Sequence, residues 1–413
     1  MKFDKISVIG LGYIGLPTAA IFASRKIKVV GVDVNPHAVE TINRGEVHIV
    51  EPELDIAVRS AVQSGYLRAS LKTEPANAFL IAVPTPFKEG KVPDLSYIKA
   101  ACESIAPVLR PGNLVILEST SPVGATEQMA KWLGNARPDL SFPEGDMGEP
   151  DIHVAHCPER VLPGQVLREL VQNDRVIGGL TTTCSEHAAS LYKLIIEGQC
   201  IITDARTAEM CKLTENSFRD VNIAFANELS MICDHMNINV WDLIKLANLH
   251  PRVNILQPGP GVGGHCIAVD PWFIVSSSPD QAKLIRRARE VNDLKPQWVL
   301  KKVDDAIEQL RLKKPRPVVA CFGLAFKPNI DDLRESPALN ITVEICKREI
   351  VDVIVVEPNI DELPTELQQR AQLVEHSHAI QHADLLVLLV DHKQFRDHPA
   401  PSHPKIIDTR GIW

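Results

Sequence analysis

The first third of the chain alternates short apolar runs with longer stretches whose apolar residues have helical spacing. Short runs of this kind fit buried strands, and the longer stretches fit helices packed on a sheet. Strands are expected at 5–9, 28–32, 79–83 and 114–117, and helices at 16–25 and 97–108. This alternation is typical of a parallel sheet with right-handed crossovers. Residues 138–150, rich in Pro, Gly and acidic residues, are expected to form a loop, and strand-like runs follow at 152–155 and 176–177.

The middle of the chain changes to helical spacing from 205 to 248. Asp204 is placed to cap the start of this stretch. Neither Pro nor Gly occurs between Ala205 and Val240, which predicts one unusually long helix. Because this helix is apolar on more than one side, it could connect two domains and also line an oligomer interface.

The last third repeats the alternation of the first. Strands are expected at 318–322, 351–356, 385–390 and 405–407, and helices at 338–348 and 364–371. The sequence therefore predicts an α/β protein in which two Rossmann-like, doubly wound α/β domains are joined by a long central helix. The expected division of the chain is 1–204, 205–300 and 301–413.

Composition narrows the class of protein. Of the 413 residues, 45% are hydrophobic and 23% are charged, which is close to the average for soluble globular proteins and excludes wholesale disorder. No apolar run reaches the roughly 18 residues of a membrane span. The chain begins in a strand pattern without the regions of a signal peptide, so a cytoplasmic location is expected. The net charge of −8, with no basic run among aromatic residues, makes nucleic acid a poor candidate partner.

Nine cysteines are spread from Cys102 to Cys346 without a CxxC pair. This pattern fits neither a disulfide framework nor a zinc ribbon, so thiols and no metal site are expected. Most such thiols are small core residues. Cys266 differs because it follows the segment 258–264, which packs two Pro and four Gly into one loop. Such a loop could expose the thiol and offer backbone N–H groups to a thiolate or oxyanion; the neighbouring His265 is not expected to be catalytic.

A GxGxxG pattern lies between the first expected strand and helix, at Gly10, Gly12 and Gly15, and Asp33 follows the second strand. Glycines at these positions let the backbone approach a pyrophosphate at a helix N-terminus, and the acid can bind the adenosine ribose. The alternative is a turn-forming glycine cluster beside a surface Asp. The register of strand, helix and acid favours a dinucleotide site, and an Asp favours NAD over NADP.

Two further features allow both a functional and a structural interpretation. Glu209, Lys212, Asn216 and Arg219 share one face of the long helix, and spacing alone favours a solvated stripe over a site. The segment Gly323-Leu324-Ala325-Phe326-Lys327 follows a strand but lacks the GxGxxG spacing, so the second α/β domain is expected to hold something other than a second NAD. Lys327 is either a partner for a phosphate or an exposed turn residue.

Taken together, these motifs resemble the UDP-glucose/GDP-mannose dehydrogenase family, whose members oxidise the C6 alcohol of a nucleotide sugar to a carboxylate with two NAD. The resemblance spans nearly the whole chain. It comprises GLGYIGLPTA from Gly10, VPTP from Val83, STSPVGAT from Ser119, CPERVLPG from Cys157, AEMCKLTENSFRDVNIAFANE from Ala208, PGPGVGGHC from Pro258 and GLAFKPNIDDLRESP from Gly323.

The sequence departs from the UDP-glucose branch of that family in two places. The residues before Asp270 are Ala268 and Val269, where that branch usually has a lysine next to the acid. The second is the segment CPERVLPG, which stands where the UDP-glucose branch commonly has PEFL. It places Arg160 at a position that is apolar in that branch. Both variants resemble the branch that oxidises UDP-N-acetyl-D-mannosamine, which implies that sugar as substrate; related 2-acetamido sugars stay open.

The resemblance also implies a set of site residues and a domain assignment. Around NAD it implies Gly10, Gly12, Tyr13, Ile14, Gly15, Asp33, Thr85, Thr126 and Arg334. Around the nucleotide sugar it implies Arg160, Val161, Lys212, Asn216, Arg219, His250, Arg252, Gly263, Phe326 and Lys327. It makes 1–204 the NAD-binding domain, 205–300 a central linker and dimerisation domain, and 301–413 the UDP-sugar-binding domain. In the implied homodimer, Arg252 crosses the subunit interface to the substrate.

The implied catalytic residues are Cys266, Lys212, Glu159, Asn216, Asp270 and Thr120. Removing four electrons from an alcohol requires an aldehyde-level intermediate to be retained, and Cys266 is expected to hold it as a thiohemiacetal that becomes a thioester. Either Lys212 or a water held by Asp270 takes the first proton, Lys212 and Asn216 stabilise oxyanions, and Glu159 is the base for hydrolysis, with Thr120 and Asp270 as water holders.

Two other functions are compatible with parts of the pattern. A two-electron dehydrogenase of the hydroxyacid type would also join a Rossmann domain to a helix with a Lys and an Asn, but it gives no role to the Cys266 loop. A non-catalytic NAD-binding regulator would bind ligand without turnover. The acid product of the favoured reaction would suit a bacterial surface polysaccharide.

Overall fold

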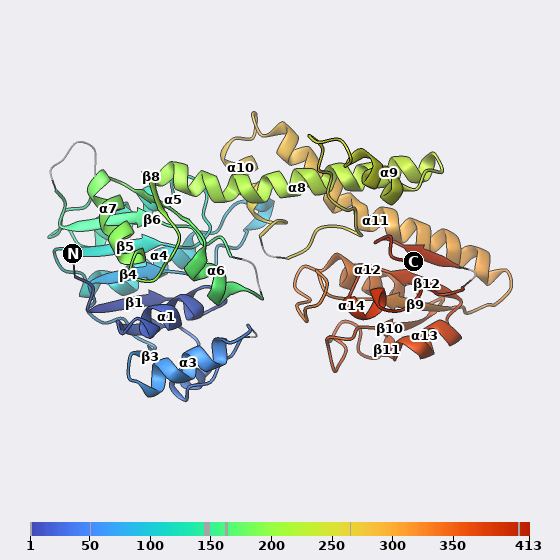
Figure 1. Cartoon of the computed structure of the whole chain (residues 1–413), viewed down its shortest axis with the longest axis horizontal. Coiled ribbons are helices and arrows are strands. Elements are labelled where there is room, and N and C mark those ends of the chain that lie inside the picture. The colour runs from blue at the N-terminus through green and yellow to red at the C-terminus, as the bar shows by residue number, and fades with distance from the viewer. Residues whose placement is uncertain (1, 50, 144–148, 162–163, 265, 404) are drawn as a thin grey trace. The chain divides into compact units, whose positions relative to one another are not determined.

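The computed structural model describes residues 2–49, 51–143, 149–161, 164–264, 266–403 and 405–413 (Figure 1). The chain divides into two compact units, Met1–Glu215 with Trp272–Ser277 and Asn216–Pro271 with Ser278–Trp413. His265 and the middle of the predicted loop 138–150 lie outside the described residues. In the part of the chain that is described, no helix combines the length and the apolar character needed to cross a membrane.

The first unit is built on an eight-stranded sheet in the order β3-β2-β1-β4-β5-β6-β7-β8. Its strands are β1 (Lys5–Ile9), β2 (Lys28–Val32), β3 (Leu67–Ser70), β4 (Ala78–Ile81), β5 (Asn113–Leu117), β6 (Ile152–His156), β7 (Arg175–Gly179) and β8 (Cys200–Asp204). Two separate apolar clusters cover the two faces of the sheet, so β4 and β5 are buried along their whole length. Strand order reverses beside β1, and ligands of such sheets bind outside the carboxyl ends of the strands at that point.

Helices pack on both faces of this sheet, as Figure 1 shows. They are α1 (Gly15–Ser24), α2 (Pro36–Asn43), α3 (Leu54–Gln63), α4 (Ser96–Ile105), α5 (Ala125–Ala136), α6 (Val166–Gln172) and α7 (Thr182–Tyr192), with short 3-10 turns at η1 (Glu89–Lys91) and η2 (Ala106–Val108). The predicted strands and helices of this region are found within a few residues of their expected bounds. The predicted run of parallel strands, however, ends at β6.

Strand β7 runs antiparallel to β6, with Ala155 opposite Gly179 and His156 opposite Gly178. The chain returns from α6 to the edge at which β6 ends, and there Arg175, the first residue of β7, forms an ion pair with Glu159, just beyond β6. A parallel strand would have required the chain to cross to the opposite edge first.

The second unit contains a five-stranded, all-parallel sheet in the order β11-β10-β9-β12-β13. Its strands are β9 (Val318–Phe322), β10 (Asp352–Val356), β11 (Ala371–Leu373), β12 (Leu385–Leu388) and β13 (Ile406–Asp408), and its flanking helices are α12 (Pro337–Cys346), α13 (His376–His382) and α14 (Lys393–Arg396). This order matches that of the five strands β3-β2-β1-β4-β5 of the first sheet. The protein therefore has the predicted fold, with two Rossmann-like α/β domains.

The predicted long helix is α8 (Ala205–His235), a single element of 31 residues. Asp204 accepts a hydrogen bond from the backbone N–H of Thr207 at 2.9 Å, as its predicted capping role requires. The helix ends where Asn237 adopts a left-handed backbone with φ +56, and α9 (Val240–Ala247) follows. The remaining helices are α10 (Asp270–Ser277) and α11 (Lys283–Arg311).

One predicted helix, 364–371, is wrong. The backbone N–H groups of Leu367 and Gln368 both donate to the carbonyl of Pro364, and the segment consists of turns until β11 begins at Ala371. Within it only Leu367 is fully buried. A short segment with a single buried side chain gains too little from packing to offset the cost of nucleating a helix.

Candidate active site

The glycine loop after β1 has the backbone that a dinucleotide site requires. Gly10 has φ +91, and a Cβ there would lie 2.7 Å from the carbonyl oxygen of Ala82. A Cβ on Gly15 would lie 1.8 Å from the carbonyl oxygen of Gly10, whereas a Cβ on Gly12 would meet nothing within 4 Å. Gly10 and Gly15 are thus required by the fold, and Gly12 leaves open space. Open space at this point, beside the N-terminus of α1, is what the pyrophosphate of a dinucleotide would require.

Asp33 lies where the acid of a dinucleotide site is expected, directly after β2. Its Oδ2 accepts from the backbone N–H of Leu11 at 2.8 Å, and its Oδ1 accepts from that of Asn35 at 2.9 Å. Asp33 is half-buried, so the residue that holds the glycine loop is also partly accessible to solvent. Tyr13 is exposed, and Ile14, which precedes α1, is half-buried.

The loops after β4 and β5 bring Thr85 and Thr120 to the same sheet edge. The Ser119 hydroxyl donates to the carbonyl of Val83 at 2.6 Å, which ties the two loops together. Thr85 and Thr120 are both half-buried, and the Thr85 Oγ1 is a buried atom with no hydrogen-bond partner among the described residues. An unsatisfied hydroxyl at this edge is suited to a ligand that supplies the missing hydrogen bond.

Thr126 and Glu209 form a buried contact that the sequence did not reveal. The Thr126 hydroxyl and backbone N–H donate to Glu209 Oε1 at 2.6 and 2.8 Å, and the N–H of Gly124 donates to Oε2 at 2.6 Å. Burial raises the pKa of Glu209, although these hydrogen bonds oppose the shift. The carboxylate thus caps the N-terminus of α5, where a negative charge is favoured.

A buried group of charged side chains lies at the end of β6. Arg175 Nη1 donates to Glu159 Oε2 at 2.6 Å, and the backbone N–H of Arg160 donates to Glu159 Oε1 at 2.7 Å. Nearby, the Tyr192 hydroxyl donates to Glu118 Oε1 at 2.6 Å. Burial raises the pKa of Glu118 to about 7, while Arg175 partly opposes this shift. The orientation of Glu159 is therefore fixed by two donors in a largely water-free environment.

Arg160, the residue that marks the departure from the UDP-glucose branch, is itself held in place. Its guanidinium forms a two-point ion pair with Glu215, through Nη2 to Oε1 at 2.5 Å and Nε to Oε2 at 3.1 Å. Both side chains are partly exposed, so the pair orients Arg160 more than it stabilises the fold. Its neighbour Val161 is half-buried.

His156, the last residue of β6, gives the first unit a pH-dependent stability. Complete burial lowers the pKa of His156 to about 3, so the folded state holds a neutral imidazole. The unfolded chain takes up a proton below about pH 6.5, and stability is lost as the pH falls through that range. Between about pH 7 and about pH 5 we expect this residue to cost the wild type about 2 kcal/mol of unfolding free energy. In urea unfolding, the unfolding free energy of a His156→Phe variant should fall by about 2 kcal/mol less than that of the wild type over the same pH interval. Equal losses in the two proteins would contradict a buried, neutral His156.

In the second unit, the loop that carries Cys266 packs tightly against the loop after β9. A Cβ on Gly263 would lie 2.5 Å from the carbonyl oxygen of Glu335 and 2.9 Å from Cβ of Phe326. A Cβ on Gly264 would lie 2.9 Å from the Phe326 ring. The glycines are thus needed for close packing, which brings the cysteine loop and the Phe326 loop together. Among the nine cysteines, all of which fall in the described part of the chain, only Cys266 is exposed.

Asn216 and Asp270 meet in the same unit. Asn216 Nδ2 donates to Asp270 Oδ2 at 2.5 Å, and both side chains are buried. The backbone N–H of Asp270 donates to the carbonyl of Cys266 at 2.9 Å, so the acid is fixed relative to the cysteine backbone. A carboxylate and an amide are in this way anchored to the residue that carries the exposed thiol.

The stripe on α8 is not uniformly solvated. Glu209, Lys212 and Asn216 are buried, whereas Arg219 is exposed. The interpretation that spacing alone favoured is therefore wrong for the first three of these residues. Burying a carboxylate, an ammonium and an amide on one helix is costly unless each has a partner or a function.

The other predicted substrate residues lie at or near the surface of the second unit. His250 and Arg252 are exposed, and the backbone N–H of Arg252 donates to the imidazole Nδ1 of His250 at 3.3 Å. Lys327 is half-buried. Arg334, predicted beside NAD, is exposed and forms an ion pair with Asp332 at 2.6 Å.

A doubly wound sheet with this glycine loop and this acid defines a dinucleotide-binding protein. Three stretches match domains of one family: 4–196 its NAD binding domain, 206–294 its central domain and 320–413 its UDP binding domain. The chain belongs to the UDP-glucose/GDP-mannose dehydrogenase family. It is thus an NAD-dependent oxidoreductase with a domain for UDP.

Individual relatives are similar over the full length. An NDP-N-acetyl-D-galactosaminuronic acid dehydrogenase of Ralstonia nicotianae is 64% identical, over 100% of this chain and 97% of its own. A UDP-N-acetyl-D-mannosamine dehydrogenase of Yersinia pestis is 63% identical, over 100% of both chains. The solved structure of a UDP-D-ManNAc dehydrogenase from Pyrococcus horikoshii superimposes with a TM-score of 0.88 at 40% identity, covering 99% of this chain and 96% of that one.

Proposed function

We propose that the protein oxidises the C6 alcohol of a UDP-sugar to a carboxylate, and that UDP-N-acetyl-D-mannosamine is that sugar. The observation that carries the proposal is the position of Cys266, an exposed thiol on a glycine loop packed against the loop of the UDP binding domain that carries Phe326. A two-electron dehydrogenase would have no use for this thiol. In alcohol-to-acid oxidation a thiol has a clear use, because it can keep the aldehyde bound between the two oxidations.

The chemistry is divided between the cofactor and the chain. NAD, when bound, accepts the hydride in each of the two oxidations. Cys266 Sγ adds to the aldehyde carbon and forms a thiohemiacetal, whose oxidation gives a thioester. Hydrolysis of the thioester releases the acid and restores the thiol. Since the chain matches one NAD binding domain, the glycine loop and Asp33 would hold the cofactor for both oxidations.

Asn216, Asp270 and Lys212 are proposed to manage charge around the reacting carbon. The amide of Asn216, oriented by Asp270, can donate to a tetrahedral oxyanion, and the ammonium of Lys212 can stabilise the same charge. Either Lys212 or a water held by Asp270 takes the alcohol proton in the first step. Arg160, Val161, Arg219, His250, Gly263, Phe326 and Lys327 are proposed to bind the UDP-sugar.

Glu159 is proposed as the base that activates water for thioester hydrolysis, with Thr120 helping to hold that water. The geometry supports this role because both Glu159 oxygens already accept hydrogen bonds, from Arg175 and from the backbone of Arg160. A carboxylate held by two donors keeps one orientation, and each of its oxygens retains a lone pair with which to accept a proton from water. The residues proposed to bind NAD are Gly10, Gly12, Tyr13, Ile14, Gly15, Asp33, Thr85, Thr126 and Arg334.

A second sugar deserves a test because of one specific observation. The relative from Ralstonia nicotianae, 64% identical to this chain, is named for an N-acetyl-D-galactosaminuronic acid product. Its similarity equals that of the Yersinia pestis protein within one percentage point, at 64% against 63%. Both sugars carry a 2-acetamido group, so the stereochemistry at the ring carbons is what a substrate panel has to decide.

We also propose the three-part division 1–204, 205–300 and 301–413, a cytoplasmic location and a homodimer. In this dimer the apolar residues of α8 line the interface and Arg252 reaches the substrate of the partner subunit. Exposed Phe218, Phe225 and Ile232 support an interface along α8. The exposure of Arg252 supports the proposal that its side chain extends to the substrate of the partner subunit.

We expect two NADH for each UDP-N-acetyl-D-mannosamine consumed, together with a product whose mass is that of the uronic acid. The purified protein is incubated with NAD and a panel of UDP-sugars that includes the N-acetylgalactosamine, N-acetylglucosamine and glucose forms, and NADH and product mass are measured together. One NADH per sugar would support a two-electron dehydrogenase. Binding without any NADH would support a regulator. Acid formed faster from a different 2-acetamido sugar would reassign the substrate and leave the reaction class intact.

A further inference from the structure

The loops after β1 and β9 have the same backbone design in the two units. Gly10 and Gly323 open these loops with φ +91 and +90, and their N–H groups donate to the last carbonyl of the neighbouring strand, at 2.8 and 2.9 Å. The next residue in each loop is a leucine. Its N–H donates to a carboxylate that directly follows that neighbouring strand, Asp33 in the first unit and Glu357 in the second.

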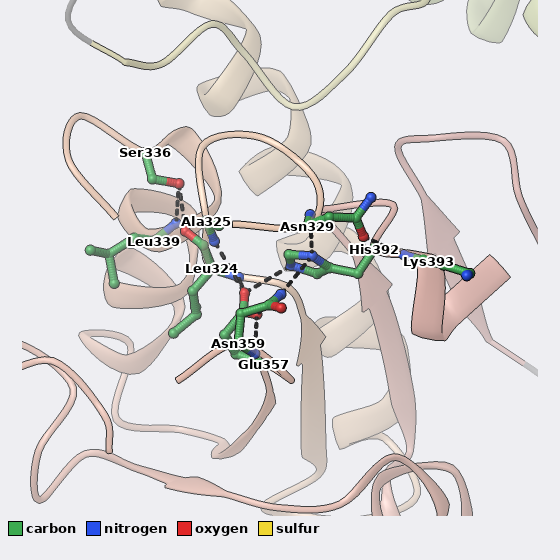
Figure 2. A network of polar contacts seen from close by, with 9 residues as sticks. All are labelled: Leu324, Ala325, Asn329, Ser336, Leu339, Glu357, Asn359, His392 and Lys393. Carbon is green, nitrogen blue, oxygen red and sulfur yellow. Dashed lines mark hydrogen bonds and ion pairs between the residues drawn. The ribbon is translucent and has the colours of Figure 1, made fainter. Parts of the chain in front are cut away.

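Glu357 differs from Asp33 in how completely its oxygens are used. Glu357 Oε2 accepts from the N–H groups of Leu324 and Ala325 at 2.7 and 3.2 Å and lies 3.0 Å from His392 Nε2. Oε1 accepts from the backbone and side-chain amides of Asn359 at 3.1 and 3.0 Å. Figure 2 shows these donors converging on the carboxylate. With its side chain fully buried, Glu357 has no acceptor left to offer a ribose.

His392 connects both ends of the loop. Its Nδ1 accepts from the backbone N–H of Asn329 at 2.9 Å, so the ring proton lies on Nε2 and is donated to Glu357. Asn329 has a left-handed backbone with φ +64, and its Oδ1 accepts from the N–H of Lys393 at 2.7 Å. The start of the loop is therefore held by Glu357 and its end by His392 (Figure 2). Phe326 and Lys327 lie between these two points in the sequence.

Burial makes this arrangement stiff. The side chains of Glu357 and His392 are both 0% exposed. The hydrogen bonds from His392, Leu324 and Asn359 lower the pKa of Glu357 in spite of the opposing effect of burial. A charge-assisted network in which every member is satisfied allows one conformation of the loop, because any other leaves a buried charge unpaired.

We propose that Glu357 and His392 are positioning residues for the nucleotide of the sugar substrate. They hold 324–329 in the conformation that presents Phe326 and Lys327 to a uridine diphosphate. Glu357 stands where a dinucleotide site has the acid that binds a ribose. Because His392, Asn359 and the loop already donate to both of its oxygens, the second unit is also prevented from binding NAD. This inference rests on the proposed function, because it assumes that the Phe326–Lys327 segment binds the UDP part of the substrate.

The test compares UDP and NAD binding by calorimetry in the full-length protein, in Glu357→Gln and in His392→Phe. Losing one buried hydrogen bond to a charged group should weaken UDP binding by roughly 10- to 100-fold. KM for the UDP-sugar should rise by a similar factor, while kcat and NAD affinity stay within about twofold of the wild type. The matched control is Thr342→Val, which removes a different buried hydrogen bond of this unit, from the Thr342 hydroxyl to the carbonyl of Ala338 within α12. This variant should leave UDP affinity unchanged.

Several outcomes would overturn the inference. UDP affinity equal to the wild type in both variants would show that the network does not position the loop. An equal loss of UDP and NAD affinity would indicate general destabilisation, and two NAD sites per chain in the wild type would refute the exclusion of NAD. If neither variant folds, hydrogen exchange of the wild type decides, because the Leu324 and Asn329 amides must then exchange far more slowly than exposed loop amides. A wild type that binds no UDP would instead refute the proposed function.

Discussion

A Cys266→Ser variant is expected to lose acid formation by at least about a thousandfold, while the first oxidation, from alcohol to aldehyde, is slowed far less. A hydroxyl is a much weaker nucleophile than a thiolate and would form an ester, which hydrolyses less readily than a thioester. The aldehyde would then be retained poorly or released. The measurement is acid and aldehyde production by mass analysis, with NADH counted in the same samples.

The matched control is Cys200→Ser, which changes a half-buried thiol at the edge of the first sheet and should leave acid formation within about twofold of the wild type. Quenching the wild type during turnover should reveal sugar attached at position 266. Undiminished acid production by Cys266→Ser, or the absence of any sugar adduct at that position, would exclude the covalent mechanism.

Breaking the ion pair between Asp220 and Arg289 should produce the largest loss of stability. Asp220 lies on α8 and Arg289 on α11, with Nη1 2.5 Å from Oδ1 and exposures of 0% and 1%. Burial raises the pKa of Asp220 to about 6 although Arg289 opposes the shift. An Arg289→Ala variant leaves a buried carboxylate without its cation, so we expect a loss of about 3–5 kcal/mol in unfolding free energy.

A double variant separates the pair from its surroundings. Asp220→Leu combined with Arg289→Met replaces both charges by apolar side chains, and it should recover most of the stability lost in Arg289→Ala, because no buried charge then lacks a partner. Urea unfolding of the wild type, of the single variants Asp220→Leu and Arg289→Met, and of the double variant gives the coupling energy. A double variant as unstable as the sum of the singles would mean that packing, and not charge, accounts for the loss.

Elements with a strong local signal were predicted well. Strands β1, β2 and β9 occupy the expected residues, because apolar runs bounded by turns define buried parallel strands without information from elsewhere. The long helix α8 was equally clear from its lack of Pro and Gly. The second long helix, α11, was not predicted, and Pro296 lies inside it. The Pro296 ring packs against Gly261, where a Cβ would lie 3.0 Å from Cγ of the proline. Local sequence does not reveal this contact.

The candidate site was predictable where a motif carries its own geometry and not where distant residues meet. The Gly10 loop with Asp33 could be placed from spacing alone. The partners of Glu159 and Thr126 could not, because Arg175 and Glu209 come from other elements. The Asn216–Asp270 contact joins positions 54 residues apart, and spacing along α8 therefore misjudged Asn216 as solvated.

Asp33 limits how the cofactor preference of this protein could be redesigned. The side chain that we propose to bind the ribose of NAD and to repel the extra phosphate of NADP is also the hydrogen-bond acceptor for Leu11. Truncating Asp33 to Ala would remove the repulsion and at the same time release the turn on which every dinucleotide depends. A successful redesign would have to keep a short polar acceptor at this position and add a cation nearby, so two changes are needed where the charge argument alone suggests one.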